Sequence, residues 1–98
     1  MNNFDKNLKA NESTLCGMPL LIDGKVVSDI TWARIDWLAQ HHLQKIASST
    51  SGWETLYRDP NDGRLWERTY PQSEAHGGGP PRLSTIAADA AEKKYAPR

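Results

Sequence analysis

The chain has 98 residues with twelve basic and twelve acidic side chains, so its formal net charge at pH 7 is zero. This length predicts a single domain, and the charge balance argues against a general nucleic-acid binder, which carries a basic excess. The single cysteine, Cys16, cannot form an intrachain disulfide, which fits a reducing compartment. No apolar run is long enough for a membrane span and no signal-peptide pattern begins the chain, so we expect a cytoplasmic protein with no membrane partner.

The first elements are short. Residues 1–14 are polar and rich in Asn and Lys, which predicts a flexible N-terminal lead-in to a domain over residues 15–98. Asp23-Gly24 lies between the apolar runs 18–22 and 25–27. A type I′ turn needs a positive φ at both central residues, so this dipeptide predicts a small β-hairpin.

A helix is predicted from residue 30 to about residue 42, with Ser28 or Asp29 as its N-cap. Its apolar surface is broad, so we expect it to pack on a sheet. Three of its polar residues are expected to face outward: Arg34, Asp36 and Gln40. Residues 43–48 could extend this helix or form a strand, and we favour the strand.

A second hairpin is predicted by the alternating segments 53–58 and 64–70. The loop Asp59-Pro-Asn-Asp-Gly63 joins them, with proline and glycine in favourable turn positions. We expect Arg58 to lie opposite Arg64, which fixes the register of the whole pair.

In this register Leu56 lies opposite Trp66. Glu54 then lies opposite Arg68 and forms a cross-strand ion pair worth a few tenths of a kcal/mol. The other face has the more continuous apolar character and is assigned to the helix side: Trp53, Thr55, Tyr57, Leu65, Glu67 and Thr69. Trp66 and Leu56 are thereby placed on a charged face, which is unusual for a solvated surface.

The C-terminal part begins with a Gly/Pro loop at residues 72–81, after Pro71 ends the strand. Residues 82–86 predict a last strand with Leu83 inward, and residues 87–95 have the composition of a helix. The predicted class is α+β: a small, largely antiparallel sheet with one main helix packed on one face and a short C-terminal helix.

No catalytic signature stands out. The string His76-Gly77-Gly78-Gly79 occurs in esterase oxyanion loops, but the chain lacks the Gly-x-Ser-x-Gly elbow that such enzymes need. The same glycines could cradle a phosphate, although prolines rather than a helix start follow them. The histidines match no zinc spacing. A small enzyme around Glu54, Glu67 and His76 has no specific support, so we predict no enzyme, no cofactor and no metal.

Arginines and a tryptophan gather on the second hairpin, and three explanations stay open. Ordinary packing is one, and a protein interface is another, since Trp, Tyr and Arg dominate binding hot spots. Stacking on single-stranded nucleic acid is the third, although nearby carboxylates dilute the positive charge.

Four motifs and one helix carry a family resemblance. They are WETLYRDP (53–60), DGRLWE (62–67), TYPQSE (69–74), HGGGPP (76–81) and IDWLAQHHLQKIA (35–47). In this order they resemble the immunity protein 27 family, small bacterial proteins linked to polymorphic and contact-dependent toxin systems. The resemblance covers roughly Cys16 to Tyr95.

The resemblance implies a non-enzymatic protein that binds and neutralises a cognate toxin C-terminal domain, of the contact-dependent, Rhs-type or type VI-delivered kind. We assign the toxin-binding surface to seven residues: Arg58, Asp59, Asp62, Arg64, Trp66, Arg68 and Glu74. Trp53, Tyr57 and Leu65 are expected to hold the fold. The alternative is a small nucleic-acid-binding accessory module that uses the Arg/Trp hairpin face. A strongly basic nuclease toxin would favour an acidic partner, and this chain is neutral.

Overall fold

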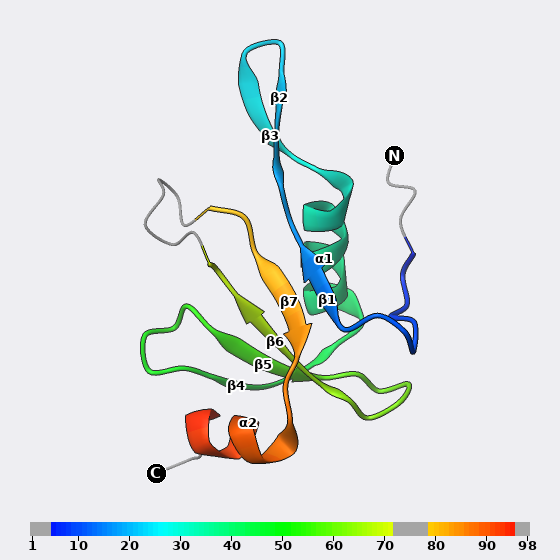
Figure 1. Ribbon diagram of the computed structural model, residues 1–98, viewed down its shortest axis with the longest axis vertical. Helices are drawn as coiled ribbons and strands as arrows, with labels where there is room; N and C mark the ends of the chain where they lie inside the picture. Colours follow the sequence, from blue (N-terminus) through cyan, green and yellow to red (C-terminus); the bar gives the residue numbers. More distant parts are fainter. Residues whose placement is uncertain (1–4, 72–78, 96–98) are drawn as a thin grey trace.

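The α+β class is confirmed by the computed structural model, which describes residues 5–71 and 79–95 (Figure 1). The elements in chain order are β1 (Thr14–Cys16), β2 (Pro19–Ile22), β3 (Lys25–Ser28), α1 (Ile30–His41), β4 (Gln44–Ser48), β5 (Thr55–Arg58), β6 (Leu65–Thr69), β7 (Arg82–Thr85) and α2 (Ala88–Tyr95). Five strands form one antiparallel sheet in the order β1-β7-β6-β5-β4, and β2 pairs with β3 as a separate hairpin.

The five-stranded sheet has a helix on each face. On one face α1 covers a core that extends from the N-terminal segment to β7: Leu8, Leu15, Ile35, Leu38, Leu43, Tyr57, Trp66 and Leu83. On the other face α2 covers a smaller core of Leu56, Ala91 and Tyr95. The predicted main helix on one face of the sheet is therefore confirmed, and the C-terminal helix closes the opposite face.

Most predicted boundaries are confirmed. The Asp23-Gly24 turn has the expected positive φ angles of 52° and 77°. Asp29 is the N-cap of α1 and its carboxylate accepts a hydrogen bond from the Trp32 backbone N–H. Residues 44–48 form a strand rather than more helix, and Leu83 is fully buried.

The predicted register of the β5–β6 hairpin is wrong by one residue. Arg58 pairs with Leu65 and Tyr57 with Trp66. The loop explains the shift, because the Asp59 N–H donates to the Arg64 carbonyl at 2.9 Å and therefore closes the hairpin. The turn is then four residues, ending at Gly63 with a φ of 79°.

A slip of one residue exchanges the faces of a strand. Trp66 therefore lies on the α1 face beside Tyr57, and Glu67 lies on the α2 face beside Leu56. The expected Glu54–Arg68 ion pair does not form, since Thr55 is the residue opposite Arg68. The prediction that Trp66 and Leu56 share a charged face is also wrong.

The prediction that Arg34 faces outward is wrong, because this residue is only 9% exposed. Its guanidinium binds the Glu12 carboxylate at 2.8 Å and the backbone carbonyls of Asp5 and Asn7 at 2.7 and 2.6 Å. These contacts hold residues 5–13 against α1, and Leu8 enters the first core. The division of the chain into a lead-in over 1–14 and a domain from residue 15 stays a prediction.

Two further observations concern the described residues. No helix among them is long and apolar enough to cross a membrane. The predicted Gly/Pro loop lies largely outside them, including His76 and Glu74.

Candidate functional site

The seven predicted toxin-binding residues do not form one surface. Asp59 and Trp66 have no exposed area, whereas Arg58 and Asp62 are exposed. Glu74 lies outside the described residues. The Trp66 ring belongs to the α1-side core, and the Arg64 guanidinium lies 4.9 Å from its centroid.

Asp59 and Arg64 have partners within the fold. The Asp59 carboxylate accepts the Asn61 backbone N–H at 2.9 Å and lies 3.1 Å from the His42 Nε2 atom, so it joins the loop to the end of α1. Arg64 donates to the Glu12 and Lys9 carbonyls at 2.6 and 2.9 Å. These two residues therefore hold the loop and the N-terminal segment in place.

The remaining predicted residues differ in exposure. Arg68 is half-buried, with its guanidinium 5.9 Å from the ring centroids of both Tyr57 and Tyr70. The Asp62 carboxylate accepts hydrogen bonds from the Arg64 backbone N–H and from the Arg64 guanidinium. These bonds, the backbone one most strongly, lower the pKa of Asp62. Among the described candidates, the side chains that remain most available to a partner are those of Arg58 and Asp62.

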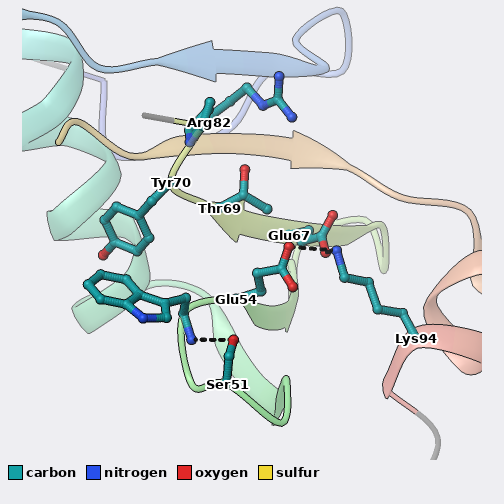
Figure 2. Close-up of a pocket in the computed structure, with 9 residues that line it drawn as sticks. Ser51, Glu54, Glu67, Thr69, Tyr70, Arg82 and Lys94 are labelled. Carbon is teal, nitrogen blue, oxygen red and sulfur yellow. Dashed lines mark hydrogen bonds and ion pairs between the residues drawn. The ribbon is translucent and has the colours of Figure 1, made fainter. Parts of the chain in front are cut away.

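A cleft that the sequence did not predict opens on the α2 face of the sheet (Figure 2). Its volume is about 520 Å³. The strands contribute Glu67, Thr69 and Arg82, which point to this face because they alternate with the core residues of the other face. Lys94 reaches in from α2. Trp53 also lines the cleft and is largely open to solvent.

Lys94 joins two carboxylates in this cleft. Its Nζ donates to the Glu54 Oε2 atom at 2.8 Å and forms an ion pair with Glu67. Partial burial alone lowers the pKa of Lys94, but the hydrogen bonds to both carboxylates outweigh burial and raise it. The Tyr95 hydroxyl donates to Glu67 at 2.7 Å, and burial together with this bond raises the pKa of Tyr95. Both carboxylates are thus held by fixed partners, and the single ammonium group offsets one of their two negative charges.

An aromatic pair forms the rim of the cleft. Trp53 is 52% exposed and meets Tyr70 edge to face, with ring centroids 5.6 Å apart. The prediction that Trp53 packs under the helix is wrong, because it precedes the start of β5 and turns away from the core. Tyr57, by contrast, is 4% exposed and holds the fold as predicted.

This arrangement suits a protein contact better than catalysis. Trp53, Tyr70 and Arg82 line the cleft, and Trp, Tyr and Arg are the residue types enriched in binding hot spots. General acid–base chemistry needs a side chain placed to reach a substrate proton, whereas the carboxylates of Glu54 and Glu67 are both engaged by Lys94. Over residues 5–71 and 79–95, no cluster of three or more His, Cys, Asp or Glu side chains could hold a metal ion.

Sequence reasoning missed the cleft because its residues are far apart in the chain. Arg82 reaches it through the pairing of β7 with β6, and Lys94 reaches it through the packing of α2. One signal was available: Lys94 follows Ala91 by three residues, so both lie on nearby parts of the helix surface.

Comparison with known proteins gives one match. No curated protein matches, and no solved structure matches. The model of the family described as immunity protein 27 matches residues 21–87. The match extends from the end of β2 through β7 and covers more than half of the chain. The chain therefore belongs to the immunity protein 27 family.

Proposed function

We propose that this protein binds and neutralises a cognate bacterial toxin and thereby protects the cell that produces both. The family match over residues 21–87 carries the proposal. The partner is the C-terminal domain of a polymorphic toxin of the contact-dependent, Rhs-type or type VI-delivered kind, and neutralisation takes place in the cytoplasm. The protein acts by binding and not by catalysis.

The cleft on the α2 face supports a binding role. Trp53 has a large aromatic side chain, and about half of its surface is exposed to solvent. Lys94 is held between Glu54 and Glu67 before any partner arrives, so little side-chain entropy is lost when a partner binds there. We therefore propose Trp53 as a toxin contact, in addition to the exposed candidates Arg58 and Asp62.

The alternative of a nucleic-acid-binding module has lost its basis. It requires a tryptophan whose ring is free to stack on a base. Trp66 is fully buried, and Arg64 is engaged by Asp62 and two backbone carbonyls.

The test is co-expression with the toxin domain encoded immediately upstream of the gene. Growth should be restored, and the two purified proteins should elute together from a sizing column. Trp53→Ala should weaken the complex by about 1–2 kcal/mol, as expected for a hot spot. Ile46→Ala is a matched control, because Ile46 is 45% exposed but lies outside this cleft.

Two results separate the parts of the proposal. If growth is not restored and no complex forms, the protein is not the immunity partner of that toxin. If a complex forms and Trp53→Ala binds as tightly as the wild type, the contact lies elsewhere on the surface.

A further inference from the structure

The β2–β3 hairpin stands apart from the rest of the protein. In Figure 1 it extends beyond the start of α1 and away from the five-stranded sheet. We call residues 18–28 the arm. Every residue of β2 and β3 is exposed, although six of the eleven residues of the arm, MPLLIDGKVVS, are Met, Leu, Ile or Val.

Both faces of the arm are apolar. Leu21 pairs with Val26 on one face, and they are 74% and 71% exposed. Leu20 pairs with Val27 on the other face, which also carries Ile22 at 52% exposure. A hairpin at the surface of a folded domain usually buries one face and solvates the other, so the exposure of both is unusual.

The base of the arm is fixed to the body. The Asp29 carboxylate accepts the backbone N–H groups of Met18 and Trp32 at 3.1 and 2.8 Å, and thus joins the arm to the start of α1. Gly17 lies so close to the body that a Cβ atom there would come within 3.0 Å of Trp32 Cβ and 3.1 Å of the Pro81 carbonyl. The arm is therefore held in one direction before any partner binds.

The exposed apolar surface of the arm is large for a monomer. Its six large apolar side chains together expose on the order of 600 Å², divided between the two faces, which is most of the ~800 Å² that each partner buries in a standard interface. An isolated two-stranded hairpin is also marginal in water. Both facts favour a partner that covers it.

We propose that the arm inserts into an apolar, uncharged cleft of the toxin domain, which contacts both of its faces. This inference rests on the proposed function. The shape of the exposed surface selects a cleft over a second copy of this chain. Edge-to-edge pairing of two arms leaves all four faces in water, and face-to-face stacking covers one face of each.

The charge of the arm defines the chemistry of the partner. Its charged side chains are Asp23 and Lys25, which lie at the turn and cancel. An uncharged, apolar surface has no electrostatic complementarity to a strongly charged groove, such as one in which an enzyme binds a polyanion. The arm therefore fits a cleft with apolar walls, and polar groups of the toxin are expected only around the Asp23-Gly24 tip.

The test measures the affinity of the full chain for the upstream-encoded toxin domain by calorimetry. One variant changes the first face, Leu21→Ser with Val26→Ser, and a second changes the other face, Leu20→Ser with Ile22→Ser. Each should weaken binding by about 30-fold or more, because each removes two buried apolar side chains from the complex. The control Ile46→Ser, with 45% exposure on β4, should change affinity less than about threefold.

Two measurements keep the result independent of folding defects. Thermal unfolding of the variants should match that of the wild type, because these side chains are exposed in the free protein. In the wild type, backbone amide exchange over residues 18–28 should slow when the toxin domain is added.

The other outcomes overturn the proposal. A loss of affinity with one face only means docking on a surface, without insertion. If both double variants bind the toxin domain as tightly as the wild type, the immunity function stands but the arm is not the contact. If the wild type itself does not bind, the proposed function and the role of the arm are both wrong. If the arm variants instead dissociate a dimer, or abolish sedimentation with phosphatidylcholine vesicles, at unchanged toxin affinity, the arm serves a second copy or a membrane.

Discussion

Charged side chains in the five-stranded body and apolar side chains in the arm have opposite surroundings. Arg34 makes hydrogen bonds to Glu12, Asp5 and Asn7, and Lys94 joins two carboxylates. In the arm, Leu21 and Val26 are more than two thirds exposed. A charged side chain picked out from the sequence is thus weak evidence of an interface, whereas apolar side chains that the fold leaves in water are stronger evidence.

The largest expected effect is a loss of folding stability when the core under α1 is disrupted. Trp66→Ala should lower the free energy of unfolding by about 3–5 kcal/mol, because it opens a large cavity in the core under α1. Trp53→Ala, at the exposed rim, should change it by less than about 0.5 kcal/mol. Urea denaturation of both variants measures the difference, and equal losses would contradict the assignment of the two tryptophans to core and rim.

A smaller effect is expected from acid. The hydrogen bond from Arg34 lowers the pKa of Glu12 from 4.5 to about 2 in the folded protein. A lowered folded-state pKa means that this stabilisation is complete above pH 4.5 and is lost as the pH falls towards 2. After allowance for solvent screening, we expect a loss of about 1–2 kcal/mol.

The variant Glu12→Gln isolates this contribution. Its unfolding free energy, measured by urea denaturation between pH 6 and pH 2.5, should depend less on pH than that of the wild type. Parallel curves would show that the Glu12–Arg34 pair does not anchor the N-terminal segment.

The smallest expected effect lies where the arm meets the body. Asp29→Ala removes the N-cap of α1 and the bond to the Met18 N–H, which should cost about 1 kcal/mol. Amide exchange over residues 18–28 should accelerate, since the arm is then free to change its direction. Ser28→Ala is the control, because Ser28 is exposed and directly precedes Asp29, the N-cap of α1. Equal acceleration of exchange in both variants would show that Asp29 does not hold the base of the arm.

Features that depend on neighbouring residues were predictable from the sequence. The turn at Asp23-Gly24 and the cap at Asp29 were correct because a few adjacent residues determine each of them. The register of β5 and β6 was wrong because the loop can close on Arg58 or on Asp59, and the choice depends on a hydrogen bond to Arg64.

Features that depend on distant residues were not predictable. Arg34 was expected in water, and its burial depends on Glu12, twenty-two positions earlier. The cleft needs Lys94 from α2 beside Glu54, which directly precedes β5. The apolar run of the arm was correctly predicted as a hairpin, but only the packing of the whole molecule shows that no described part of the body covers it.

The absent side chain of Gly17 has a consequence for how such a protein can change its partner. The direction of the arm is set at its base, where the backbone meets Trp32 and Pro81 without room for another atom. The side chains beyond that base support no part of either core. Substitutions along β2 and β3 can therefore alter which surface is recognised without a cost to folding, so binding specificity can diverge while the domain beneath it stays the same.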